Sequence, residues 1–126
     1  MGFAYVDSSV IVAIALGEPT AAAQTQRLAS FSALYSSQLL EAELRSALKR
    51  DELAFDPWLI DTIVQVKPNR SLRKELTTVL DTGYARGADC LHLAVALYIS
   101  VDPMVFTFLT LDNRQEEIAR ALGFMT

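Results

Sequence analysis

Four acidic residues occupy positions from which their carboxylates could meet: Asp7, Glu43, Asp89 and Asp112. Clustered carboxylates repel, because two unit charges about 4 Å apart cost on the order of 4 kcal/mol at an effective dielectric near 20. Such a cluster must take up protons or bind cations, and all-oxygen ligands suit the hard ions Mg²⁺ and Mn²⁺. Zinc would instead favour cysteine or histidine, and Cys90 and His92 are thin support for it. The four acids therefore predict a site that binds a hard divalent cation, Mg²⁺ or Mn²⁺.

Each acid also has an ordinary structural explanation. Asp7 and Asp112 precede helical sequence and could serve as N-caps, and Asp89 opens a helix whose dipole favours an acid. Glu43 could be a boundary residue that pairs with Arg50. One shared site nevertheless accounts for the four positions more economically than four unrelated roles.

Alternating strand and helix patterns predict an α/β fold with a single domain over residues 1–126. Its core would be a central parallel sheet of four to five strands, flanked by helices. Strands are expected at 3–6, at 33–36, in the second half of 57–66, and at 104–110. Helices are expected at 8–16, 19–30, 37–51, 71–83 and 88–100, and from 113 to just before Gly123. Ligands bind outside the carboxyl ends of parallel strands, where Asp7 and Asp112 would both lie.

The helix expected at 37–51, with Ser37 as a possible N-cap, places one acid near its buried face. At 100° per residue, one apolar face is centred on Leu40, Leu44, Ala47 and Leu48. Glu43 falls closer to this face than Glu41, which falls on the side of Arg45. We therefore expect Glu43 to point toward the sheet and Glu41 toward solvent.

The composition indicates a cytoplasmic protein with no membrane partner. No apolar run approaches the roughly 18 residues of a membrane span, and the single Cys90 fits a reducing compartment. The net charge of −4 is unusual for a nucleic-acid coating protein, so any RNA must use a local basic patch or a bound metal. Arg86, just before the Asp89 helix, is the first candidate contact, followed by Arg73 and Lys74. A solvated helix start explains the latter two equally well.

Four stretches of the chain resemble, in order and spacing, the signature blocks of PIN-domain ribonucleases: "YVDSSVIVAIAL", "SSQLLEAELRSAL", "RGADCLHLAVAL" and "FLTLDNRQEEIARALG". They are most similar to the VapC toxins of bacterial toxin–antitoxin pairs. The resemblance puts the acidic quartet of the family on Asp7, Glu43, Asp89 and Asp112. It puts the supporting hydroxyls of the family on Ser9 and Thr110.

This resemblance implies a PIN-like fold and an endoribonuclease that depends on Mg²⁺ or Mn²⁺. It also implies a homodimer and inhibition by a cognate VapB-like antitoxin. Family members often continue into a further edge strand, which we expect to be minimal here because the chain stops soon after Gly123.

Other interpretations of the strand-end aspartates fit less well. A haloacid-dehalogenase-type phosphatase would need a second aspartate where Ser9 stands, and a receiver domain would need an acidic pair near the first strand. The serious alternative is a PIN fold kept as an RNA- or protein-binding module with little hydrolysis. His92, one turn after Asp89, could be a metal ligand or a proton carrier, but a histidine hydrogen-bonded near the site is the favoured interpretation.

Overall fold

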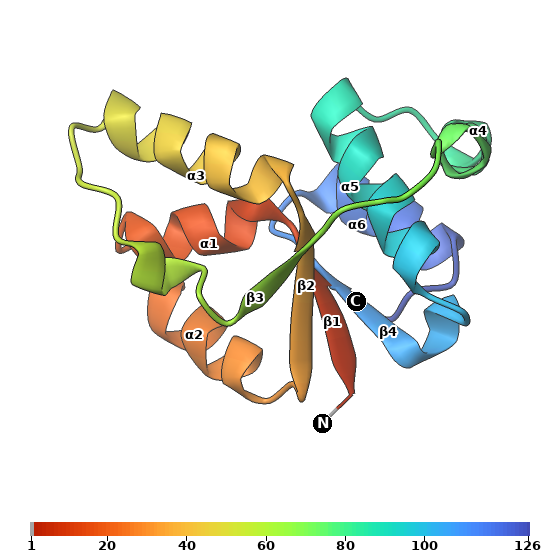
Figure 1. The fold of residues 1–126 in the computed structure, drawn as a ribbon. Coiled ribbons are helices and arrows are strands. Elements are labelled where there is room, and N and C mark those ends of the chain that lie inside the picture. Colours follow the sequence, from red (N-terminus) through yellow and green to blue (C-terminus); the bar gives the residue numbers. More distant parts are fainter. Residues whose placement is uncertain (1) are drawn as a thin grey trace.

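Four parallel strands form the central sheet of the computed structural model, which describes residues 2–126 (Figure 1). Their order across the sheet is β3-β2-β1-β4. The strands are β1 (Phe3–Val6), β2 (Ala33–Ser37), β3 (Ile63–Val66) and β4 (Phe106–Leu109). Aromatic and β-branched side chains recur in them, as suits a pleated and largely buried surface. The predicted α/β fold with a central parallel sheet is confirmed.

Three helices cover each face of this sheet (Figure 1). One layer holds α1 (Ser8–Ala15), α2 (Ala21–Ala29) and α3 (Leu39–Arg50). The other holds α4 (Arg73–Thr82), α5 (Gly87–Ile99) and α6 (Asn113–Ala121). None of the helices within residues 2–126 is both long and apolar enough to span a bilayer.

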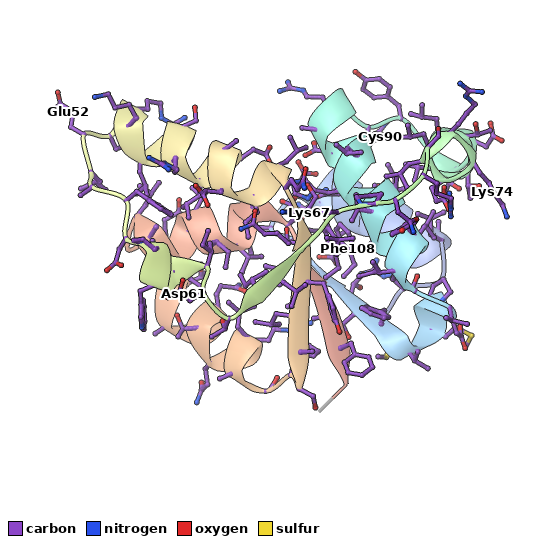
Figure 2. All side chains as sticks on the ribbon, viewed as in Figure 1. Glu52, Asp61, Lys67, Lys74, Cys90 and Phe108 are labelled. Atoms are coloured by element: carbon purple, nitrogen blue, oxygen red, sulfur yellow. The ribbon has the colours of Figure 1, made fainter. Side chains whose placement is uncertain are left out.

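Alternation along the strands divides the core into two clusters. In β1, Ala4 and Val6 pack with the α1–α3 layer, whereas Tyr5 packs with the α4–α6 layer. The Tyr5 ring stacks on Phe108 of β4 with centroids 5.3 Å apart, and Phe108 lies between the sheet and α5 in Figure 2. Both faces of the sheet are therefore buried, as parallel sheets require.

The register of the central strands sets the position of the candidate site. Val6 of β1 pairs with Leu109 of β4, so both strands end level with each other. The backbone N–H of Asp7 then donates to the carbonyl of Leu109 at 2.9 Å, which extends the pairing by one residue. Asp7 and Thr110 consequently leave the sheet at the same rim, as predicted from the ends of the two apolar runs.

Several predicted boundaries need correction. The strand predicted at 104–110 is shorter, because 3₁₀-helix η2 (Pro103–Val105) occupies its start. The region 57–66 begins with 3₁₀-helix η1 (Pro57–Leu59), so only its second half is a strand, as predicted. Ser37 is the last residue of β2 rather than the N-cap of α3. Its hydroxyl still accepts a hydrogen bond from the N–H of Leu39 at 2.8 Å.

Beside β4, the C-terminal segment makes a single isolated parallel bridge between Met125 and Thr107 and forms no fifth strand within residues 2–126. Met125 donates to the carbonyl of Phe106 at 3.0 Å and accepts from the N–H of Phe108 at 2.8 Å. These two hydrogen bonds cover part of the edge of β4, which would otherwise be open to another strand.

Gly83 ends α4 as predicted, but not through the left-handed conformation common at helix ends. Its φ of −178° is extended backbone that any residue adopts. The reason for glycine is space: a Cβ at this position would lie 3.1 Å from Cγ1 of Ile118 on α6. The α4–α5 loop therefore approaches α6 closely.

Candidate active site

Asp7 lies at the centre of the rim and is only 4% exposed. Its Oδ2 accepts a hydrogen bond from the N–H of Ser9 at 3.1 Å, so Asp7 is the N-cap of α1. Its Oδ1 accepts from Nε2 of Gln115 at 3.2 Å. Both carboxylate oxygens are thereby held in place, which fixes the orientation of the side chain.

Thr110 and Ser9, the two predicted supporting hydroxyls, connect Asp7 to the start of α6. Thr110 Oγ1 lies 3.4 Å from Asp7 Oδ2 and 2.6 Å from Gln115 Oε1. The hydroxyl has one proton, and the shorter contact with Gln115 is the better place for it. Ser9 Oγ lies 3.3 Å from Thr110 Oγ1 and accepts from the N–H of Leu111 at 3.0 Å. These contacts tie the loop after β4 to the start of α1.

Glu43 enters the rim from α3, as its helical position predicted. Its Oε1 accepts hydrogen bonds from Nε2 of His92 at 2.6 Å and from the hydroxyl of Ser8 at 2.9 Å. The hydrogen bond from His92 is the main reason that the pKa of Glu43 lies below its usual value. Arg50 pairs with Asp51 instead of Glu43, so the alternative of a Glu43–Arg50 pair is wrong. Glu41 pairs with Arg45 at 3.1 Å on the outer face, as expected.

His92 is completely buried and connects Glu43 to the core. Its Nδ1 lies 2.7 Å from the hydroxyl of Tyr5, and its Nε2 lies 3.6 Å from Asp7 Oδ1. Because carboxylates only accept, Nε2 carries a proton toward Glu43, and Nδ1 lies within hydrogen-bond distance of the Tyr5 hydroxyl. Burial raises the pKa of Tyr5, so its hydroxyl stays a donor. The favoured interpretation of His92 as a hydrogen-bonded histidine beside the site agrees with this geometry.

Asp89 in α5 and Asp112 just before α6 complete a set of four acids at this edge of the sheet. We call the set Asp7, Glu43, Asp89 and Asp112 the acidic rim. Burial raises the pKa of Asp89, and the negative charges of Asp7, Asp112 and Glu43 raise it further. Asp112 is the N-cap of α6, and its Oδ1 accepts from the N–H of Gln115 at 2.9 Å. The chain thus brings the four predicted acids close enough for their charges to act on one another.

The chemistry of these donors fits a hard divalent cation, whereas their present arrangement does not form a coordination site. Oxygen-only carboxylates are the ligands that Mg²⁺ and Mn²⁺ prefer, and their mutual repulsion would fall on binding a cation. Within residues 2–126, however, no group of three or more His, Cys, Asp or Glu residues is arranged to hold a metal ion. The carboxylates of Asp7, Glu43 and Asp112 accept hydrogen bonds from protein donors instead. Metal binding would require some of them to turn.

A pocket of about 600 Å³ opens beside Asp89 and Asp112. Arg86, the first candidate RNA contact, lines it, together with Arg114. The other candidates, Arg73 and Lys74, do not line it and begin α4. Lys74 projects from the outer side of that helix (Figure 2). The structure therefore brings only Arg86 of the three predicted basic contacts to the acidic rim.

A second hollow of about 410 Å³ lies along α3 and is lined by Glu43 and Arg50, among others. Of the four predicted acids, Glu43 is the one that lines this hollow, whereas Asp89 and Asp112 line the other pocket.

Gln115, Ser8 and Arg114 were not predicted as site residues. The spacing of Asp112 and Gln115 matches a capping box, in which an N-cap residue is followed three positions later by Glu or Gln. That signal could have marked Gln115 as structurally important. Its contact with Asp7 depends on how α6 packs against β1, which the local sequence does not encode.

The family model of the PIN domain matches residues 4–121, and the chain belongs to the PIN-domain family. The PIN domain is a nuclease-like fold, and its members are in general metal-dependent nucleases that act on RNA. A search of curated proteins found no match for the chain.

Proposed function

We propose that this protein is an endoribonuclease that hydrolyses RNA phosphodiester bonds with Mg²⁺ or Mn²⁺ bound by Asp7, Glu43, Asp89 and Asp112. The observation that carries the proposal is the convergence of acids from the ends of β1 and β4 and from α3 and α5 on one rim. A protein that only bound RNA would gain nothing from this concentration of negative charge next to a polyanion.

A bound Mg²⁺ or Mn²⁺ would supply a water of lowered pKa and positive charge next to the phosphate. The residues of the chain prepare the place for it. Ser9 and Gln115 hold the two oxygens of Asp7, while Thr110 supports Gln115 from the opposite side. In this proposal Ser9 and Thr110 keep Asp7 oriented, and such supporting contacts set the affinity of a metal site.

His92 and Ser8 serve Glu43 in the same way. They keep this carboxylate ionised and hold it at the rim, and Tyr5 fixes the ring of His92 from behind. Glu43 would pass from these two donors to the cation, so its charge would be paired in both states. Its side chain is about one-third exposed, so there is room for this motion.

We further propose that the protein acts in the cytoplasm as a VapC-like toxin, paired with a VapB-like antitoxin. The acidic rim supports pairing with an antitoxin, because an arginine inserted by the antitoxin would pair with the carboxylates and compete with the metal ion. A homodimer is part of the same proposal, since α2 buries none of its residues and still presents several alanines to solvent. Light scattering at micromolar concentration tests the dimer, and a monomer alone would contradict it.

The test of the main proposal is cleavage of RNA by the wild type and by Asp7→Asn with Mg²⁺, with Mn²⁺ and in chelator. We expect cleavage only by the wild type and only with metal. Sequencing of RNA ends after brief expression would then identify the target. Absence of metal-dependent cleavage, with RNA binding retained, would favour the alternative of a PIN-fold binding module.

A further inference from the structure

The α4–α5 loop, residues 83–86, presents an aromatic side chain next to the acidic rim. Tyr84 is 68% exposed and lines the same pocket as Asp89 and Asp112. An exposed tyrosine alone is unremarkable, because single apolar groups are common on protein surfaces. What distinguishes Tyr84 is the way its backbone is held and the charges around it.

Three consecutive residues fix this loop against α6. Gly83 lets the backbone approach Ile118, where any Cβ would lie only 3.1 Å from Cγ1. The carbonyl of Tyr84 accepts a hydrogen bond from Nε of Arg114 at 3.2 Å, and Ala85 is buried. The backbone of Tyr84 is thus held before any ligand arrives, so binding there loses little backbone entropy.

Two arginines flank the tyrosine in the same pocket. Arg114 uses Nε for the Tyr84 carbonyl, which leaves the terminal guanidinium nitrogens available. Arg86 is exposed, and within residues 2–126 its side chain has no hydrogen bond or ion pair, even with the nearby Asp89 and Asp112. A free guanidinium beside two carboxylates is available for an incoming anion.

We propose that this pocket binds an unpaired nucleotide of the RNA next to the cleaved bond, with its base stacked on Tyr84 and its phosphates contacted by Arg86 and Arg114. The proposal rests on the function proposed above and assigns to Tyr84 the base next to the cleaved bond. A base inside a duplex has both faces covered, whereas an unstacked base offers a face to an aromatic ring. A volume of about 600 Å³ is ample for a nucleotide. Stacking tolerates any base, so this pocket selects strandedness rather than sequence.

The first experiment measures binding without chemistry. A fluorescein-labelled single-stranded RNA of about ten nucleotides is titrated with protein in chelator at low salt, beside the same strand in a duplex. Tyr84→Ala should weaken single-strand binding about 5- to 150-fold, and Tyr84→Phe should retain it. Trp58→Ala is the matched control, because Trp58 is 72% exposed but lies in η1 within the opposite layer (Figure 1). It should bind like wild type.

The second experiment measures salt dependence. Arg86→Gln and Arg114→Gln should each lower the slope of log affinity against log salt by about 0.7, the value for one phosphate contact on a single strand. Arg45→Gln, on the outer face of α3, should leave the slope unchanged. Equal loss of single-strand and duplex binding in Tyr84→Ala would overturn the proposal. The proposal would also be overturned if Tyr84→Ala bound single strands as tightly as Trp58→Ala does. It would be overturned as well if the wild type did not bind single strands.

These outcomes separate the pocket from the catalytic proposal. Metal-dependent cleavage with normal RNA binding by Tyr84→Ala would leave the nuclease intact and refute the pocket. Absence of cleavage, with Tyr84→Ala weakened selectively on single strands, would support the pocket and refute the nuclease. A Tyr84→Ala variant that lost only antitoxin binding would mean that this surface contacts protein rather than RNA.

Discussion

His92 Nε2 lies 2.6 Å from Glu43 Oε1, and this hydrogen bond joins helices from opposite layers of the sheet. It passes over the carboxyl end of β1, where Asp7 stands. Because His92 also contacts Tyr5 of β1, one imidazole sets the position of Glu43 relative to both the strand and α5. The spacing of the acidic rim on the α3 side therefore depends on a residue that carries no negative charge.

Replacing His92 should cost stability and metal affinity together. His92→Ala leaves a buried hydroxyl on Tyr5 without its partner and opens a cavity, so we expect a loss on the order of 3 kcal/mol in urea unfolding. Tyr5→Phe should cost about 1 kcal/mol and keep Glu43 in place. Tyr98→Phe, which removes a hydroxyl bonded to Asn69 near the surface, is the control and should cost less. A His92→Ala variant as stable as wild type would contradict the role of this histidine.

The Glu43–His92 contact also predicts a pH dependence. The pKa of Glu43 is lowered in the folded protein, so its contribution is present above the ordinary value of 4.5 and is lost as pH falls through the folded pKa. The difference in unfolding free energy between wild type and Glu43→Gln should therefore shrink below pH 4.5. Urea unfolding from pH 7 to pH 3 measures it, and a difference that does not change with pH would be inconsistent with an ionised Glu43.

The amide of Gln115 is a neutral group that donates a hydrogen bond to Asp7. Gln115→Glu should therefore lower the free energy of unfolding, because it adds a fifth carboxylate next to the acidic rim. The added carboxylate replaces a donor at 3.2 Å from Asp7 Oδ1, so we expect a loss of about 2–4 kcal/mol in chelator. Mg²⁺ should recover more stability in this variant than in wild type. Gln26→Glu on the exposed face of α2 is the control and should be nearly neutral in both conditions. Thermal unfolding with and without Mg²⁺ gives the comparison.

Two substitutions of Asp7 should separate its roles in capping and in metal binding. Asp7→Asn keeps an oxygen for the N–H of Ser9 and lowers repulsion, so its stability in chelator should stay within about 1 kcal/mol of wild type. Asp7→Ala loses the cap and should be less stable than Asp7→Asn by about 0.5–2 kcal/mol. Mg²⁺ at one hundred times its Kd should stabilise wild type by about 2.7 kcal/mol and both variants far less. An equal response to Mg²⁺ in all three proteins would exclude Asp7 as a ligand.

A pair far from the rim predicts a separate acid transition. Arg70 holds Glu75 through two hydrogen bonds, at 3.0 and 2.6 Å, and lowers the pKa of Glu75 to about 2. A lowered pKa contributes stability that is present above 4.5 and lost as pH falls toward 2. Glu75→Gln should therefore be less stable than wild type at pH 7 and approach it near pH 2. Circular dichroism melts across this range would measure the convergence.

Much of the acidic rim could be predicted because strand ends and helix faces are local properties. Asp7 and Thr110 follow apolar runs, and parallel strands that start level also end level. The orientation of Glu43 toward the sheet followed from the 100° spacing of residues along its helix. Cys90 is buried in α5, as an apolar helix implies (Figure 2).

The rest depends on how distant elements pack. The sequence separates Glu43 from His92 by 49 residues and Asp7 from Gln115 by 108, and neither pair follows from a local period. Gly83 resembled an ordinary helix stop, whereas its role is to make room for Ile118. The local pattern places Arg114 only in a helix, because its contact with the Tyr84 carbonyl needs the loop and α6 side by side.

Asp7 closes the first turn of α1 whatever ion its carboxylate also binds. A lineage that lost cleavage would keep its selection for a side-chain oxygen at this position, because the N–H of Ser9 would still need a partner. Descendants without activity should therefore carry Asn or Ser at position 7 more often than Ala, while the acid at position 89, which only complements the dipole of α5, should be lost more readily. An intact polar residue at position 7 is consequently a poor guide to activity among relatives, and position 89 is the better diagnostic.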